Sequence, residues 1–159
     1  MTTYIKPYDP LTDAQGIIDL ELKPKDAEEV IASTGVPVNE VLEYIANNED
    51  VGDKFVLIHK GNIEGVLGVM QSQVDPEVGI VYFLTSDMLS DFKYKLLKYT
   101  RATLDLFLMK YKVLTNYTLG DYTDAIKWLT AVGAVWDETE YILEDPDKPF
   151  KQFYFYKEP

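Results

Sequence analysis

One segment of the chain alternates strand and helix in a way that few folds allow. The run Gly79-Ile-Val-Tyr-Phe-Leu84 has strand length and no polar position, which is typical of a strand covered on both faces. A second strand is predicted at 113–119. Between them a helix is predicted near 89–111, where a core-facing stripe recurs at helical spacing: Leu89, Phe92, Leu96, Thr100, Leu104, Phe107 and Tyr111. Two strands joined through a helix form a right-handed crossover, so we expect 79–85 and 113–119 to be parallel neighbours.

A β-hairpin is predicted before this unit. Lys54-Phe-Val-Leu-Ile-His59 and Ile63-Glu-Gly-Val-Leu-Gly-Val-Met70 have strand composition, and Lys60-Gly61-Asn62 has turn composition. The other expected elements are a strand at 4–7, helices near 12–22, 27–32, 38–45 and 122–131, and strands near 139–144 and 151–156. We expect Asp26 to cap the second helix, Gly35 to end it, and Gly133 to end the last helix with a positive φ. This order predicts one α+β domain over residues 1–159, with a central mixed sheet flanked by helices.

The charge of the chain limits its partners. The sequence has 15 basic and 27 acidic residues, a formal net charge of −12. Such a chain repels phosphate backbones and anionic lipid, so we expect neither nucleic acid nor a membrane surface as a partner. With no cysteine and one histidine, His59, we expect no metal site, and we interpret His59 as a hairpin residue. The sequence shows no targeting signal and no apolar run of about 18 residues, which predicts a soluble protein.

The segment Leu119-Gly-Asp-Tyr-Thr-Asp-Ala-Ile-Lys-Trp-Leu-Thr-Ala-Val-Gly-Ala-Val-Trp136, together with the expected order of elements, resembles the GNAT acetyltransferase superfamily. More narrowly, the chain is similar to phage proteins related to the internal virion protein A of T7-like podophages. That similarity rests on Ile126, Leu129, Gly133 and Ala134 of this segment, on Tyr82-Phe-Leu-Thr-Ser-Asp87, and on Asp26-Ala-Glu-Glu-Val-Ile-Ala-Ser-Thr-Gly35, which looks like that family's Asp-x-x-Glu…Gly segment. The resemblance extends over nearly the whole chain and implies a GNAT-like fold.

The resemblance also implies where a cofactor would bind. In GNAT enzymes a glycine-containing loop opens the long helix, and its backbone N–H groups hold the pyrophosphate of acetyl-CoA. The matching loop here is 85–92, and no glycine stands between Gly79 and Gly120. Two aspartates of the loop place negative charge where a pyrophosphate would bind. We therefore expect no bound cofactor and a vestigial loop made of Leu84, Ser86, Asp87, Ser90 and Asp91.

The usual proton donor of the superfamily is also missing. By resemblance, a tyrosine four residues after the motif alanine protonates the CoA thiolate, and counting from Ala125 places Leu129 there. Leucine has no proton to give. If the chain is nevertheless active, the candidate acids are Tyr122 and Tyr117 and the candidate bases are Glu64 and Glu77.

Two charged clusters have both a structural and a functional interpretation. A basic cluster on the long helix could attract an acidic partner or a CoA phosphate, although a solvated helix face explains it as well. Its members are Lys93, Lys95, Lys98, Arg101, Lys110 and Lys112. An acidic cluster near the last hairpin could face a basic neighbour, or could simply be exposed. Its members are Asp137, Glu138, Glu140, Glu144, Asp145 and Asp147.

The glycine-free loop and Leu129 favour a non-catalytic protein, and the resemblance implies that it is a phage protein of the internal virion type. The resemblance implies that it acts through contacts with other phage virion proteins or a host protein, in the virion or the host cytoplasm. The alternative is an active N-acetyltransferase that uses acetyl-CoA despite a degenerate pyrophosphate loop. An acidic mimic of DNA is disfavoured, because the acids do not recur at phosphate-like intervals.

Overall fold

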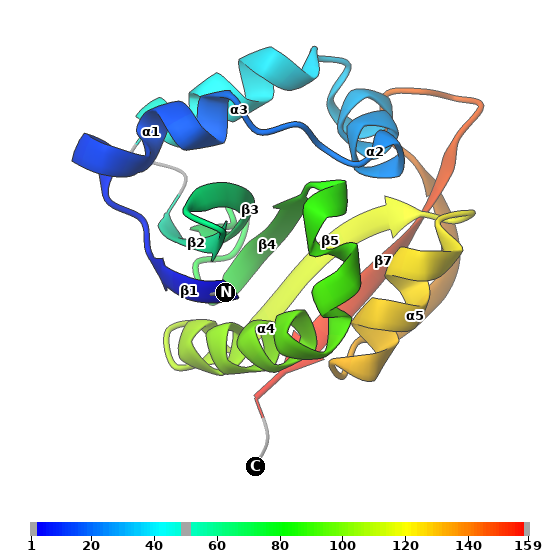
Figure 1. The fold of residues 1–159 in the computed structure, drawn as a ribbon. Helices are drawn as coiled ribbons and strands as arrows, with labels where there is room; N and C mark the ends of the chain where they lie inside the picture. Colours follow the sequence, from blue (N-terminus) through cyan, green and yellow to red (C-terminus); the bar gives the residue numbers. More distant parts are fainter. Residues whose placement is uncertain (1–2, 49–51, 158–159) are drawn as a thin grey trace.

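A seven-stranded mixed sheet forms the centre of the molecule. The structure is a computed structural model, which describes residues 3–48 and 52–157, without the side chains of residues 89–91. The strand order is β1-β2-β3-β4-β5-β7-β6, and every neighbouring pair is antiparallel except β4 and β5 (Figure 1). The strands are β1 (Thr3–Pro7), β2 (Asp53–His59), β3 (Asn62–Gln71), β4 (Val78–Thr85), β5 (Val113–Leu119), β6 (Val135–Ile142) and β7 (Pro149–Tyr156).

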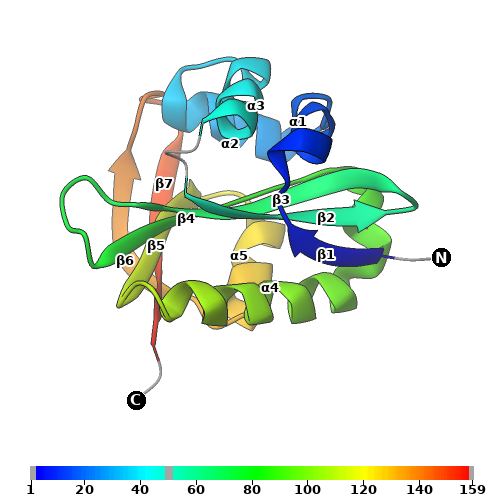
Figure 2. The ribbon, with the colours of Figure 1, turned by 90° about the vertical axis from the view of Figure 1, so that its left-hand side faces the viewer.

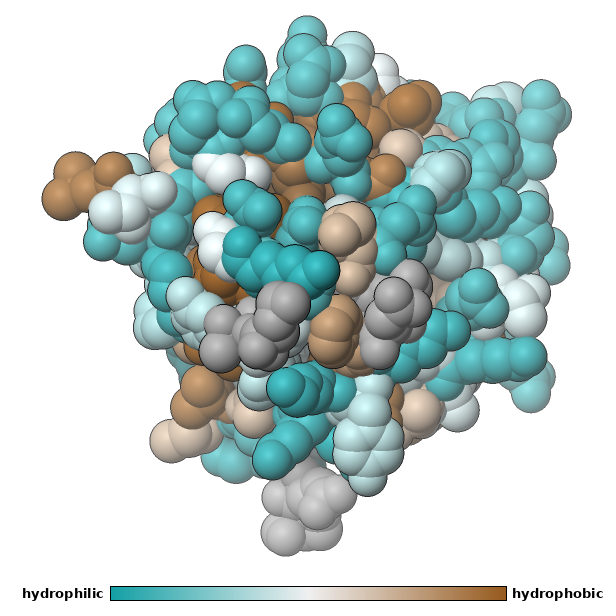
Figure 3. All heavy atoms as spheres, viewed as in Figure 1, coloured by the Kyte–Doolittle hydropathy of each residue, from teal (hydrophilic) through white to brown (hydrophobic). Residues whose placement is uncertain are grey.

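Helices cover both faces of the sheet. Three lie above it in Figure 2, namely α1 (Pro10–Ile18), α2 (Pro24–Thr34) and α3 (Val38–Asn47). Two lie below it, α4 (Lys93–Leu108) and α5 (Thr123–Ala131), and a short 3₁₀ helix, η2 (Asp87–Phe92), precedes α4. No helix in residues 3–48 or 52–157 is long and apolar enough to cross a membrane. The face in Figure 3 is mostly hydrophilic, as expected for a chain in which 26% of residues are charged.

Each face of the sheet has its own core. Above the sheet, Ile17 and Leu42 of the helices pack with Val56 and Val66 of the strands, and all four side chains are almost fully buried. Below it, Leu104 and Phe107 of α4 pack with Val69, Leu114 and Phe153. Helical stripes and alternating strands therefore meet as their periodicities predict, and hydrophobic burial holds the three layers together.

The parallel crossover and the hairpin are confirmed. Val78, Gly79 and Ile80 of β4 pair in parallel with β5, and α4 connects the two strands. In the β2–β3 turn, Lys60 and Gly61 both have positive φ, as a two-residue type I′ turn requires. Gly35 ends α2, as predicted, and has a φ of +70°.

Three predicted boundaries were wrong by four residues each, and the others differ by three residues or fewer. The first helix ends at Ile18 and not near 22, because Asp19 already leaves the helical conformation. The long helix begins at Lys93 and not at 89, because η2 forms the preceding turns. Strand β6 begins at Val135 and not near 139, and an irregularity between Trp136 and Glu140 divides its pairing with β7.

Candidate functional site: the cleft between β4 and β5

The two parallel strands separate towards their carboxyl ends. Their ladder stops at Ile80 and Thr115, so the rest of β4 and of β5 has no direct strand partner between the two. In an unpaired strand edge, backbone N–H and C=O groups need other partners when water is excluded. The first question about this cleft is therefore what satisfies its edges.

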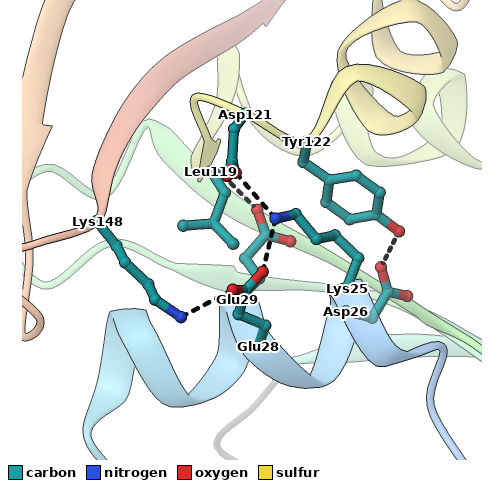
Figure 4. Close-up of polar contacts among 8 residues, drawn as sticks. All are labelled: Lys25, Asp26, Glu28, Glu29, Leu119, Asp121, Tyr122 and Lys148. Atoms are coloured by element: carbon teal, nitrogen blue, oxygen red, sulfur yellow. Dashed lines mark hydrogen bonds and ion pairs between the residues drawn. The ribbon is translucent and has the colours of Figure 1, made fainter.

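Helix α2 lies across the open end and supplies side-chain acceptors to both strands. The Asp26 carboxylate accepts hydrogen bonds from the backbone N–H of Thr85 on β4, at 3.1 Å, and from the Thr85 hydroxyl, at 3.4 Å. One turn further along α2, the Glu29 carboxylate accepts a hydrogen bond from the backbone N–H of Leu119 on β5, at 2.8 Å (Figure 4). Residues three apart lie on the same helix face, so one face of α2 bridges the two separated strands.

A side chain of β5 closes the narrow end of the same cleft. The Asn116 side-chain amide donates a hydrogen bond to the Val81 carbonyl of β4 at 2.5 Å. Its carbonyl oxygen accepts a hydrogen bond from the backbone N–H of Tyr117 at 2.7 Å. The Asn116 amide is thus hydrogen-bonded to the carbonyl of Val81, the first β4 residue beyond the ladder with β5. A ligand that lay between the two strands would have to compete for this carbonyl.

Asp26 is also tied to the helix on the opposite face. The Tyr122 hydroxyl, immediately before α5, donates to Asp26 Oδ1 at 2.6 Å, and both residues are buried. Burial and the neighbouring Asp26 carboxylate raise the pKa of the Tyr122 hydroxyl well above its usual value of 10.0. The phenol therefore stays protonated and acts as a hydrogen-bond donor to Asp26 at ordinary pH.

Glu29 titrates near neutral pH. Burial raises the pKa of its carboxyl from 4.5 to about 7, against the opposing effects of the nearby Thr118 hydroxyl and the Leu119 N–H. The neighbouring Asp26 carboxylate raises that pKa further.

Ion pairs fix the outer side of α2. Lys25 contacts Glu28 at 2.7 Å and Asp121, at the start of the β5–α5 connection, at 3.0 Å. Lys148 of the β6–β7 turn contacts Glu28 at 2.8 Å (Figure 4). Exposed pairs each contribute little, about 0–1 kcal/mol, but these three share two residues and hold the same helix from two directions.

The β4–α4 connection is organised by its own side chains. The Ser86 hydroxyl accepts a hydrogen bond from the Met88 N–H at 3.2 Å and donates one to the Glu64 carboxylate at 3.1 Å. Asp87 is exposed in the first turn of η2, and Leu84 is buried in the core. The side chains of Ser90 and Asp91, the other two residues of the predicted vestigial loop, lie outside the described part of the structure.

A cavity of about 830 Å³ runs through the cleft. Its polar wall includes Asp26, Glu29, Thr118 and Asp124, and its apolar wall is formed mainly by α3, β4 and α5. This volume lies within the range of small-molecule sites, so the cleft is large enough for a ligand even though its strand edges are occupied.

The predicted acids and bases do not form one constellation. Tyr122 is bound to Asp26, whereas Glu64 is bound to Ser86. Glu77 pairs with Lys112 at 3.1 Å on the β3–β4 side of the sheet.

The remaining residues that the sequence singled out have packing contacts. Leu129 is buried in the lower core, and the Tyr117 ring packs edge-on against Tyr141 at 5.3 Å. The His59 ring nitrogen Nδ1 hydrogen-bonds the Thr3 hydroxyl at 2.8 Å, and its ring lies 4.5 Å from the ring of Phe92.

Sequence reasoning missed the role of three polar residues. The prediction that Asp26 caps α2 was wrong. Helix α2 already begins at Pro24, and the Asp26 carboxylate accepts hydrogen bonds from Thr85 and Tyr122 instead. Glu29 entered only as the glutamate of the Asp-x-x-Glu…Gly resemblance, with no role assigned to it, and Asn116 was not singled out. The available signals were a lone amide within a β-strand pattern and two acids at i, i+3 on a helix.

Comparisons with known proteins agree on the fold. Spermidine N-acetyltransferase from Vibrio cholerae, solved with CoA and spermine, superposes with a TM-score of 0.71 at 12% identity, covering 97% of this chain and 95% of that one. A GNAT-family acetyltransferase from Streptococcus pneumoniae gives 0.65 at 12% identity, over 99% and 100% of the two chains. IAA acetyltransferase from Bacillus cereus gives 0.59 at 12% identity, over 98% and 100%.

The sequence itself is similar to a phage family. Residues 66–142, just under half of the chain, match a family model described as bacteriophage T7, probable scaffold protein Gp13. A search of curated proteins gave no match. The chain thus combines a GNAT acetyltransferase fold with sequence similarity to a phage scaffold family.

Proposed function

We propose that this chain is a non-catalytic phage assembly protein that uses a GNAT fold as a framework for contacts with other proteins. Its partners would be other virion proteins, as in the internal virion protein A group that the sequence resembles, or a host protein. It would act in the virion or in the host cytoplasm. The sequence match to a phage scaffold family supports this proposal.

One structural observation carries the non-catalytic part of the proposal. In the GNAT superfamily, which this chain resembles, the two parallel strands separate at their carboxyl ends and open the acetyl-CoA cleft. Here the free edges of β4 and β5 are bonded to the chain's own Asp26, Glu29 and Asn116. A ligand would have to break these bonds before making its own. The glycine-free β4–α4 connection supports the same conclusion, because side chains keep a phosphate away from its backbone.

A calorimetric titration of the full chain with acetyl-CoA tests the proposal. We expect no saturable binding below about millimolar, which corresponds to less than roughly 4 kcal/mol of affinity. Asp26→Ala with Glu29→Ala removes the two acceptors supplied by α2, and Glu28→Ala is the matched control on the same helix. If occupied edges are what prevents binding, the double variant gains affinity for acetyl-CoA and the control does not.

An active N-acetyltransferase is the second candidate, and the 830 Å³ cavity in the cleft is the observation that favours it. Micromolar acetyl-CoA binding by the unmodified chain, with turnover on an amine that Tyr122→Phe abolishes, would establish the enzyme and refute the non-catalytic role. The assembly role has a separate test. The protein should be recovered with assembly intermediates or particles of the phage that encodes it, and its consistent absence from both would contradict that role.

A further inference from the structure

Two oppositely charged surfaces lie at different ends of the molecule. The basic surface is the exposed start of α4, with Lys93, Lys95 and Lys98. The acidic surface is the β6–β7 hairpin, with Glu138, Glu140 and Glu144. Figure 2 shows the first turns of α4 at the right of the molecule and the β6–β7 turn at the upper left. The two surfaces therefore cannot contact each other within one chain.

The basic surface stands out against the charge of the whole protein. Residues 93–104 contain four basic residues and no acidic one, in a chain of net charge −12. Within the described residues no ion pair involves any of the three lysines. Tyr94, 86% exposed, stands between Lys93 and Lys95 in the sequence, and Met88, 51% exposed, belongs to η2, which leads into α4. Tyrosine and methionine are enriched at protein interfaces, so this surface has more than charge to offer a partner.

The acidic surface also lacks ion pairs within the part of the chain that the structure describes. Between 137 and 147 six residues are acidic and none is basic. Asp137 and Asp145 are used internally, since they accept hydrogen bonds from neighbouring backbone N–H groups at 2.9 Å. Glu138, Glu140 and Glu144 are exposed, and no ion pair in the described part of the chain involves them. Glu140 and Glu138 belong to β6, the edge strand of the sheet.

We propose that the start of α4 in one copy of this chain binds the β6–β7 hairpin of a second copy. The argument for a second copy is charge complementarity, because each chain carries both halves of the contact. Since the two surfaces face different directions, the contact is head-to-tail, and each copy can bind a further copy in the same way. The copies form a ring if the rotation from one copy to the next closes on itself, and a filament if it does not. This inference rests on the proposed assembly function and names a second copy of the chain as one of its partners.

Sedimentation at two salt concentrations tests the inference with the full chain. At about 0.1 M salt the mean mass should rise with protein concentration, and at about 1 M it should return to that of the monomer, because the Debye length falls from roughly 10 Å to roughly 3 Å. Association that salt does not weaken, or a monomer under both conditions, overturns the inference. Recovery of the protein with phage particles would leave the assembly function standing in either case.

Charge reversal identifies the surfaces. The basic-surface variant K93E/K95E/K98E and the acidic-surface variant E138K/E140K/E144K should each remain monomeric at low salt. The six-fold variant, whose net charge is again −12, should regain salt-sensitive association. The control K110E/K112E/K157E has the same net charge as the basic-surface variant but changes exposed lysines elsewhere, so it should associate as the unmodified chain does. A thermal melt of each variant confirms folding, and a folded six-fold variant that stays monomeric refutes the pairing.

Discussion

Removing the Asp26 carboxylate should loosen α2 from the sheet. Asp26 is 7% exposed. Among the described residues, it is the only one on α2 whose side chain hydrogen-bonds both β4 and the residue before α5. In Asp26→Ala the Thr85 N–H and the Tyr122 hydroxyl both lose their acceptor. Both residues are at most 8% exposed and line the cavity, so only water that enters the cleft can replace the lost acceptor.

The magnitude follows from those two donors. A buried donor without a partner costs about 1–3 kcal/mol, and two of them cost about 2–6 kcal/mol. Removing a buried carboxylate also relieves its desolvation, which offsets part of this cost. We therefore expect Asp26→Ala to lower the free energy of unfolding by about 2–4 kcal/mol. Tyr122→Phe removes one donor and leaves Asp26 bound to Thr85, so it should cost about 1 kcal/mol.

Urea unfolding followed by circular dichroism measures both values and their coupling. Because the two substitutions share one hydrogen bond, the double variant should be destabilised by less than the sum of the single variants. Glu28→Ala is the control on the same helix, and its partly exposed ion pairs predict a loss of about 1 kcal/mol or less. A loss below about 1 kcal/mol in Asp26→Ala, or strict additivity with Tyr122→Phe, would refute the role assigned to this carboxylate.

Three further substitutions test other parts of the structure. Gly133→Ala should cost about 1 kcal/mol in the unfolding free energy, because Gly133 has φ +106° and nothing lies within 4 Å of an added Cβ, so backbone strain is the whole effect. Gly68→Ala should cost more, about 2–3 kcal/mol, since its Cβ would lie 2.1 Å from the Tyr82 ring; an unchanged melting temperature would refute this packing. Glu29 has a raised pKa in the folded chain, so its stabilising effect is complete below about pH 4.5 and is lost as pH rises through about 7. Glu29→Gln keeps an acceptor for Leu119 and should flatten the stability profile between those pH values, and an unaltered profile would contradict the shift.

Periodicity alone predicted most of the sheet. The β2–β3 hairpin and the crossover from β4 to β5 follow from local patterns: an apolar run, a turn pair and a helical stripe. Gly133 is another local success, because its N–H bonds Thr130 and the next N–H bonds Leu129, as in a Schellman motif. Each of these features is encoded within a few residues.

The features that failed depend on distant contacts. Asp26 was predicted to be a cap because an acid before an apolar helical run usually is one, yet its partners stand 59 and 96 residues away. The start of α4 was misplaced because the apolar spacing of 89–111 continues through η2. In η2 the Ser86 hydroxyl accepts a hydrogen bond from the Met88 N–H, which stabilises a 3₁₀ turn. Hydrophobic spacing does not distinguish such a turn from an α-helical one.

The occupied cleft can also be weighed as an energy that a ligand must overcome. A ligand running between β4 and β5 would release the bonds from Thr85 to Asp26, from Leu119 to Glu29 and from Asn116 to Val81. At about 1–3 kcal/mol for each unpaired buried group, this opening costs roughly 3–9 kcal/mol before any contact with the ligand is counted. Micromolar affinity corresponds to about 8 kcal/mol, so at the upper end the ligand would need about 17 kcal/mol of gross interaction, slightly more than twice that. These three bonds hold α2 against both strands and join β5 to β4, while a cavity remains in the cleft. If copies join through the start of α4 and the β6–β7 hairpin, the relative orientation of these two surfaces determines whether the assembly closes into a ring.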